Sequence, residues 1–297
     1  MITTSRVDSA LGCWTLTQWQ PESDTRLAQA VLRIWLFEGS TVNPRERVFP
    51  DGSLEIVVQL NASYHRADSP SQPFPPVSVG GVRTTALTIE GPGHPVRVLG
   101  IRLAPSAAFS ILGTSLDALT DCSYDLHDII GMAAAELGER CHGALDGPAC
   151  VREALRWVKR RLERGSEPDP VVSSFAARIE GGGGALAIDG IEAASRRSRS
   201  RFAARFRAQI GVAPKHFARI VRFRQALQFL LTRNAALGDV AARAGYYDQA
   251  HMNAEFHSFA GLTPRGFRDA AHYPDSLSLA ECEPQPGSKF QDAAAAL

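Results

Sequence analysis

A strict repeat near the C-terminus constrains the fold of this chain more than any other feature of its sequence. The pattern F-x4-G-x2-P-x2-F at residues 206–217 returns at residues 256–267. Four anchors in the same register indicate one supersecondary unit that is used twice. In each copy the glycine suits the left-handed cap at the end of a helix, and the proline suits the first position of the next. The sequence therefore predicts two similar helical units in tandem.

Charge sets the same region apart from the rest of the chain. Between Ala193 and Gly238 there are eleven arginines and lysines and no acidic residue, although the whole chain has 32 basic and 31 acidic residues. Where acids are interleaved, a run of arginines is usually a solvated surface, but here they are absent. A local excess of this kind is typical of a segment that binds nucleic acid.

Several classes of protein do not fit the sequence. No apolar run reaches the 18 residues of a membrane-spanning helix, and the first residues lack the pattern of a secretion signal. The five cysteines are scattered without C-x-x-C spacing, and the eight histidines show no metal-binding spacing. We therefore expect a cytoplasmic protein with free thiols, no metal and no cofactor.

The N-terminal part has the pattern of a sheet followed by helices. Short runs rich in β-branched residues predict strands at 31–37, 54–60 and 96–103. A segment with four prolines, 65–76, is expected to be a surface loop. From Pro105 onward the periodicity becomes helical, with one apolar stripe over 151–165.

We predict an α+β fold, with a strand-rich N-terminal domain and following helices. A C-terminal all-α domain would hold two helix-turn-helix units joined by a linker helix. The predicted bounds are 1–164 for the N-terminal domain, 165–184 for a Gly/Pro-rich linker with a flexible run of glycines, 185–273 for the DNA-binding domain and 274–297 for a disordered tail.

The second unit has the pattern of a helix-turn-helix. Gly245 supplies the tight turn after a short helix, and Asp248 caps the next helix. An apolar stripe then runs along one face of that helix: Met252, Phe256 and Phe259. The exposed positions of its first two turns are Gln249, Ala250, His251, Asn253 and Ala254.

The first two turns of a recognition helix are the part that meets base edges. The amides of Gln249 and Asn253 suit bidentate contact with adenine. A solvated helix start is the alternative for Gln249, and for His251 a capping or phosphate contact is favoured over base reading.

The first unit has the same layout. Ser198 is expected to cap a helix whose buried face carries Phe202, Phe206 and Ile210. The residues expected to face DNA are Arg199, Ser200, Ala203 and Arg207, with Arg201 reaching phosphate from the flank. Residues 217–231 predict a connecting helix, on which Arg219 and Arg222 are either solvated or in contact with phosphate.

Residues 237–267, LGDVAARAGYYDQAHMNAEFHSFAGLTPRGF, resemble the second helix-turn-helix of AraC/XylS-type transcription regulators, and FARIVRFRQAL upstream resembles their linker helix. The resemblance covers about 185–270. It implies two units that enter successive major-groove segments, and it places Gln249, Ala250 and His251 near base edges.

Two positions depart from the family pattern. Ala254 stands where the family usually has an arginine that reaches DNA. The first unit lacks a glycine turn near Arg196, and Ser200, Ala203 and Ala204 are small. We therefore expect the first unit to grip phosphates more than it reads sequence.

The N-terminal half resembles an uncharacterised domain that is often fused ahead of this module. The matching positions are Trp35, the P-D-G turn at 50–52 with Glu55, Gly80-Gly81, and G-I-R-L-A-P-S-A-A at 100–108. In this family that part senses a small molecule or mediates dimerisation. The candidate ligand-binding residues are Trp35, Glu55 and Arg102, although core packing is favoured for the tryptophan.

The leading hypothesis is a sequence-specific, non-enzymatic bacterial transcription regulator, classed as an activator. Its expected partners are double-stranded DNA, a small-molecule effector, a second copy of the chain and RNA polymerase, but no membrane. Three alternatives stay open: a non-specific architectural DNA binder, an enzyme in the N-terminal half, and a DNA-repair regulator that accepts alkyl groups on a cysteine.

Overall fold

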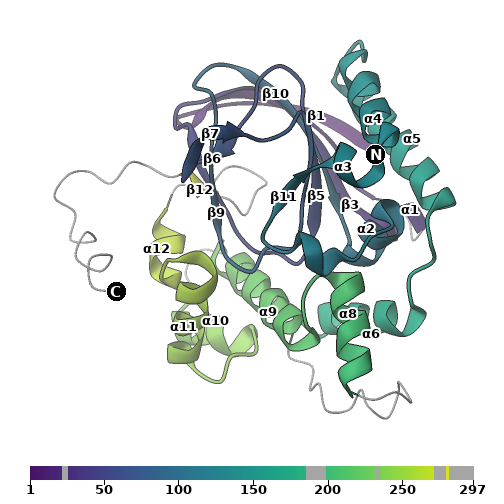
Figure 1. The fold of residues 1–297 in the computed structure, drawn as a ribbon. Coiled ribbons are helices and arrows are strands. Elements are labelled where there is room, and N and C mark those ends of the chain that lie inside the picture. The colour runs from purple at the N-terminus through teal and green to yellow at the C-terminus, as the bar shows by residue number, and fades with distance from the viewer. Residues whose placement is uncertain (22–25, 185–198, 232–234, 271–278, 281–297) are drawn as a thin grey trace.

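The computed structural model describes residues 1–21, 26–184, 199–231, 235–270 and 279–280, arranged as Figure 1 shows. Its larger sheet is antiparallel, with strand order β1-β2-β3-β10-β5-β8-β11. The strands are β1 (Ile2–Ser9), β2 (Gly12–Trp19), β3 (Val31–Thr41), β5 (Leu54–Gln59), β8 (Val77–Gly80), β10 (Val96–Leu103) and β11 (Ser123–Asp125). The three strands predicted from the sequence, now β3, β5 and β10, are confirmed and lie side by side.

A second sheet, in the order β12-β4-β9-β6-β7, lies opposite the first and away from α4 and α5 (Figure 1). Its strands are β4 (Arg45–Val48), β6 (His65–Arg66), β7 (Ser69–Pro73), β9 (Leu87–Glu90) and β12 (Leu279–Ala280). The prediction of a loop at 65–76 was therefore wrong. Two of its prolines, Pro70 and Pro73, are accommodated because β7 is the last strand of the sheet, where a missing N–H breaks no ladder.

Helices cover the face of the larger sheet that is turned away from the smaller one. They are α1 (Arg26–Ala30), α2 (Pro105–Leu112), α3 (Leu126–Ile130), α4 (Met132–His142) and α5 (Gly147–Arg164), with a 3₁₀ turn, η1 (Leu116–Leu119). Alternate strand residues such as Ile34, Leu36 and Ile101 are fully buried beneath them. The indole N–H of Trp157 on α5 donates to the carbonyl of Ala133 at 2.8 Å, which ties α5 to α4.

The C-terminal part is helical, as predicted. Its helices are α6 (Pro170–Gly181), α8 (Arg199–Ile210), α9 (Pro214–Leu231), α10 (Leu237–Arg243), α11 (Gln249–Ala260) and α12 (Pro264–Asp269). The two glycines of the repeat, Gly211 and Gly261, have φ values of +99° and +65°, and each repeated proline begins a helix. The repeat therefore corresponds to two similar helix–turn–helix joints, and the predicted α+β fold is confirmed.

Phenylalanine rings pack against one another through the C-terminal core. Phe206 packs against Phe175 and Phe217 with ring centroids 5.7 and 5.9 Å apart. Phe223 on α9 packs against Phe256 on α11 at 4.9 Å. Most of these pairs meet edge to face, the arrangement that the charge distribution of the rings favours. The long helix α9 thus joins the core of the first unit to that of the second.

Helix α6 lies within the range 165–184 that was predicted as a linker. Its residue Phe175 packs edge-on against Phe202 of α8, and Gln209 of α8 accepts from the backbone N–H of Asp169 at 2.9 Å. The glycines after α6 touch α9 directly. A β-carbon on Gly184 would stand 2.2 Å from the carbonyl oxygen of Ala218. The glycine run is thus not a free hinge: it lets the backbone approach α9 closely.

Replacing Gly184 by alanine is expected to lower the free energy of unfolding by about 1.5 kcal/mol, because its φ of +76° and the contact with Ala218 both oppose a β-carbon. Gly181 is the matched control, since a β-carbon there would meet nothing within 4 Å and it is the last residue of α6. Gly181→Ala should raise stability by up to about 1 kcal/mol. Urea unfolding measures both changes, and equal effects would contradict the close-approach explanation.

The two predicted domains share one continuous apolar core. Phe49, which follows β4, packs edge-on against Phe267 of α12 at 5.6 Å and Phe223 of α9 at 6.4 Å. Among the described residues of the predicted tail, Leu279 and Ala280 pair with β4 as β12; the rest of 274–297 lies outside the described residues.

Candidate nucleic-acid interface

Helices α10 and α11 form a helix-turn-helix with the predicted local structure. Gly245 has φ +80° in the turn, and the N–H of Tyr246 closes it by donating to Ala241. Asp248 is the N-cap of α11, and its carboxylate accepts from the backbone N–H of His251 at 2.7 Å. This bond satisfies one of the free N–H groups at the start of the helix. The first turn of α11 is therefore held in a defined direction.

The faces of α11 are divided as expected. Met252, Phe256 and Phe259 are buried, while the predicted reading residues are all exposed: Gln249, Ala250, His251, Asn253 and Ala254. A further exposed side chain, Tyr247, projects from the turn just before them with 93% of its surface accessible. Tyr247 was not among the residues predicted to face DNA, because an aromatic residue beside a glycine turn is more often part of a core.

Helix α8 presents the corresponding surface of the first unit. Phe202, Phe206 and Ile210 are buried, whereas Ser200, Arg201 and Arg207 are exposed and Ala203 is half-buried. Ser200, Ala203 and Arg207 lie at i, i+3 and i+7 on one face. Arg199 begins α8, but its side chain, like the predicted cap Ser198, lies outside the described residues.

Several of the arginines counted as a positive surface are bound to groups elsewhere in the protein. Arg205 of α8 forms an ion pair with Asp169, the N-cap of α6. Arg224 of α9 donates to the backbone carbonyl of Asp51 at 3.1 Å. The partners of these arginines lie outside the acid-free stretch 193–238, so a count along the sequence overstates the charge available to a ligand. Arg201, Arg207 and Lys215 remain exposed.

A buried carboxylate in α11 engages two more of these arginines. The Nε atom of Arg219 donates to Oε1 of Glu255 at 2.6 Å, and Nε of Arg222 lies 3.9 Å from Oε2. The Glu255 side chain keeps only 7% of its surface exposed. Arg219 and Arg222 therefore orient α11 on α9, and this role is favoured over the phosphate contact considered for them.

The surroundings of Glu255 are polar. Arg222 also donates to the carbonyl of Gly245 at 3.3 Å and lies over the ring of Tyr246 at 5.3 Å. Burial, with the nearby Glu255 carboxylate as a second cause, raises the pKa of the Tyr246 hydroxyl well above its usual value. The sequence contains a signal for this ion pair. Glu255 follows Met252 by three residues and precedes Phe259 by four, and an acid in an apolar stripe requires a partner cation.

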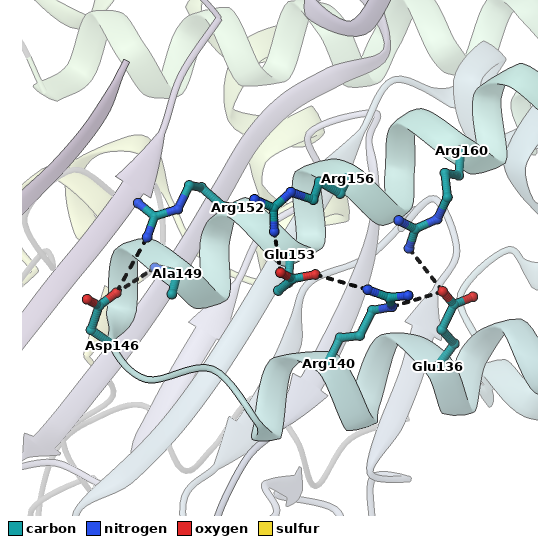
Figure 2. A network of polar contacts seen from close by, with 8 residues as sticks. All are labelled: Glu136, Arg140, Asp146, Ala149, Arg152, Glu153, Arg156 and Arg160. Atoms are coloured by element: carbon teal, nitrogen blue, oxygen red, sulfur yellow. Dashed lines mark hydrogen bonds and ion pairs between the residues drawn. The ribbon is translucent and has the colours of Figure 1, made fainter.

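A different group of arginines, on α4 and α5, forms ion pairs with glutamates at the protein surface. On the outer face of α4 and α5, Glu136 pairs with Arg140 at 2.9 Å and with Arg160 at 3.0 Å, and Glu153 pairs with Arg140 and Arg156 (Figure 2). These exposed pairs contribute little to stability individually. Arg156 and Arg160 of α5 are therefore already paired with acidic residues.

In the N-terminal domain, Trp35, Glu55 and Arg102 come together on the face of the larger sheet opposite α5. The register pairs Arg102 of β10 with Glu55 of β5, and Gly100 of β10 with Trp35 of β3. The indole Nε1 of Trp35 donates to Oε1 of Glu55 at 2.8 Å. A β-carbon on Gly100 would stand 2.2 Å from the indole, so the glycine allows the ring to lie across β10.

Arg102 extends this group toward the P-D-G turn. Its Nη1 atom lies 3.1 Å from Oδ2 of Asp51, and its Nε atom lies 3.9 Å from Glu55. Burial alone would raise the pKa of the Asp51 carboxyl, but Arg102 and the hydrogen bonds from Ser53 hold this pKa below its usual value. All three predicted residues thus adjoin one another, and a bound ligand for them stays a prediction.

Within the described residues, no cluster of histidine, cysteine or acidic side chains has the arrangement of a metal site. None of the helices in the described ranges combines the length and apolarity needed to cross a membrane.

Comparisons with known proteins divide the chain in a similar way. Residues 192–270 match a family described as "Helix-turn-helix domain", and residues 18–125 match "Domain of unknown function (DUF6597)". Among curated relatives, the HTH-type transcriptional activator RhaR of Yersinia pseudotuberculosis is 36% identical over 63 residues, which are 21% of this chain and 22% of that protein. RhaR of Pectobacterium atrosepticum is 33% identical over 64 residues, 22% of each chain.

The chain therefore spans about a fifth of the length of these relatives. Distant similarity to solved structures extends further. Unsaturated fatty acid-bound ToxT from Vibrio cholerae has a TM-score of 0.43 and 11% identity over 84% of this chain and 97% of its own. The C-terminal domain of AraT, a response regulator from Geobacillus stearothermophilus, has a TM-score of 0.33 and 18% identity over 37% of this chain and 98% of its own. The helix-turn-helix identification of the C-terminal residues is confirmed by the family match.

Proposed function

We propose that this chain, whose residues 192–270 form an AraC-type helix-turn-helix domain, is a sequence-specific DNA-binding transcription regulator. The supporting observation is the division of α11: one face is packed into the domain and ion-paired through Glu255, and the other exposes Gln249, His251 and Asn253 at its N-terminal half. A helix held so firmly and exposed at that end has the form needed to read a major groove.

In this proposal the two units have different tasks. Gln249 and Asn253 of α11 contact base edges, with Ala250 close to them and His251 beside a phosphate. On α8, the small residues Ser200 and Ala203 approach the groove, while Arg199, Arg201 and Arg207 bind phosphates. The second unit then supplies most of the sequence preference, and the first supplies affinity and register.

The N-terminal domain is proposed to respond to a small molecule through Trp35, Glu55 and Arg102. These three side chains combine an aromatic surface with one negative and one positive group on the sheet face opposite α5, a combination that suits a polar organic effector. We also propose that the protein acts in a bacterial cytoplasm, where it would bind promoter DNA as an activator. Contacts with a second copy and with RNA polymerase belong to the same proposal.

The test is selection of bound duplexes from a random pool by the purified full-length chain, followed by competition binding at one fixed salt concentration. A regulator would enrich a defined motif and bind it at least about a thousandfold more tightly than unrelated DNA. Equal affinity for all duplexes would instead identify a non-specific architectural binder. No binding in dilute buffer would remove the proposal.

Replacing Arg201 and Arg207 together by glutamine should reduce the slope of log affinity against log salt by up to about 1.8, since each phosphate contact contributes about 0.9. The affinity for specific and unrelated duplexes should fall by similar factors. Arg152→Gln with Arg156→Gln removes the same charge from α5, where both arginines already pair with acids (Figure 2). An unchanged slope in the α8 variant, or the same reduction in the α5 variant, would contradict phosphate contact by α8.

A further inference from the structure

The N-terminal domain contacts the C-terminal ends of α8 and α11, the two helices proposed to face DNA. After α8, the carbonyl of Gly211 accepts a hydrogen bond from the hydroxyl of Thr120 at 2.7 Å. At the end of α11, the carbonyl of Phe259 accepts from the backbone N–H of Ala86 at 2.8 Å, and that of Ala260 accepts from the Arg47 guanidinium at 3.2 Å. The last carbonyls of a helix lack partners within it, so these donors satisfy groups that would otherwise need water.

The donors Thr120 and Ala86 come from two loops that are fastened to each other. Asp121 has a φ of +59°, in the left-handed region where residues other than glycine are uncommon. Its carboxylate accepts from both the backbone N–H and the hydroxyl of Thr84, and its own N–H donates to Val82 at 3.1 Å. Arg83 adds a bond to the Asp121 carbonyl at 2.7 Å. The loops 82–86 and 119–122 therefore form one tied structure, named here the Asp121 loop pair.

The linker helix is held against the same domain. Gly52 lies against the ring of Phe217, and a β-carbon there would make a tight contact of 3.1 Å with the ring. Arg224, further along α9, donates to the carbonyl of Asp51. Figure 1 shows α9 between α8 on one side and α10 and α11 on the other. The positions of α8 and α11 are thus determined by the N-terminal domain as well as by α9.

We propose that the Asp121 loop pair is a spacing clamp: it sets the distance and angle between α8 and α11, and so the separation of the two DNA segments that the chain accepts. The inference rests on the proposed function for its consequence on DNA. Thr120, Asp121 and Thr84 act as positioning residues, at the helix ends remote from the exposed N-terminal turns of α8 and α11. Because one base pair moves a site by about 3.4 Å along the duplex and rotates it, a fixed pair of helices tolerates one spacing.

Two variants test the clamp in the full-length chain. Thr120→Val keeps the size of the side chain but removes the bond to Gly211. Asp121→Gly removes the carboxylate but retains a residue that adopts φ +59° readily. Asp128→Ala is the charge-matched control, since Asp128 is exposed on α3 and outside the loop pair. Circular dichroism and thermal unfolding establish that each variant is folded.

Affinity is measured on the selected duplex and on duplexes with one base pair inserted or deleted between its two conserved segments. The wild type and Asp128→Ala should bind the altered duplexes about tenfold or more less tightly. Thr120→Val and Asp121→Gly should reduce this difference to about threefold or less, while single-base discrimination within each segment persists. Undiminished spacing discrimination in both folded variants would overturn the clamp.

Hydrogen–deuterium exchange separates this inference from the proposed function. With no DNA present, the amides at the ends of α8 and α11 should exchange faster in Asp121→Gly than in the wild type or in Asp128→Ala. Unchanged exchange would overturn the clamp even if the protein binds DNA. If the wild type selects no DNA while the exchange difference is seen, the regulator proposal fails and the mechanical link between the loop pair and the two helices stands.

Discussion

Replacing Arg219 by methionine is expected to lower the free energy of unfolding by about 3 kcal/mol, at the low end of the range for breaking a buried ion pair. The Glu255 carboxylate that it binds at 2.6 Å has only 7% of its side chain exposed. Without Arg219 this charge stays inside the protein, with Arg222 and the ring of His251 each 3.9 Å from one of its oxygens. The effect lies at the low end because the Arg219 side chain is itself 31% exposed, so that water already screens part of the interaction.

Urea unfolding of the full-length chain measures this loss. Arg201→Met is the matched control, because it removes an exposed arginine from α8 and should change stability by no more than about 0.5 kcal/mol. Adding Glu255→Gln to Arg219→Met should recover part of the loss, because an unpaired amide costs less to bury than an unpaired carboxylate. If the double variant is no more stable than Arg219→Met, the loss comes from packing of the arginine stem and not from the ion pair.

The C-terminal helices could be predicted because their signals are local. Gly211 and Gly261 occupy left-handed positions at the ends of helices, Asp248 caps α11, and Met252, Phe256 and Phe259 are spaced for one buried face. Each of these choices depends on backbone conformation or on helical periodicity within a few residues. Strands β3, β5 and β10 were predictable for the same reason, because they are runs of β-branched residues bounded by turns.

The short strands were harder to predict. Ser69–Pro73 contains two prolines and forms a strand only because it is at the edge of a sheet, a position that the sequence does not state. Strands β1 and β2 were not predicted either. β1 is mostly exposed and rich in polar residues, so pairing with β2 decides its conformation more than burial does. Tertiary context overrides intrinsic preference in both cases.

The candidate surface was predicted in part. The exposed positions of α8 and α11 follow from periodicity, but the charge available on them does not. Arg205 and Arg219 lie in a stretch without acids, yet Asp169 and Glu255 reach them from elsewhere in the chain. The same holds for the contact of Thr120 with Gly211, which joins residues 91 positions apart. Contacts at such separations depend on topology, and no pattern within a window reveals them.

Replacing Gln249 by alanine is expected to relax the preference for one base of the operator by about 1–3 kcal/mol, while the other bases keep their effect. Gln249 is the first residue of α11 and is exposed, directly after the cap Asp248. Its terminal amide presents a donor and an acceptor side by side, the pair that adenine offers in the major groove. Because Ala254 provides no long side chain further along the helix, a larger share of the discrimination should depend on Gln249 and Asn253 than on the later turns.

The measurement compares affinities of wild type and variant for the selected duplex and for its set of single-base changes, at one salt concentration. Gln72→Ala makes the same chemical change at an exposed site on β7 and should leave every ratio unaltered. A reading contact and a solvated helix start predict different patterns. If Gln249 reads a base, the variant should lose about 5- to 150-fold of the discrimination at one base, since 1.4 kcal/mol is a factor of ten. If Gln249 is only a solvated helix start, no affinity ratio should change. An equal loss on all duplexes would assign Gln249 to the phosphate backbone, and base reading by the second unit would then rest on Asn253 alone among the two amides.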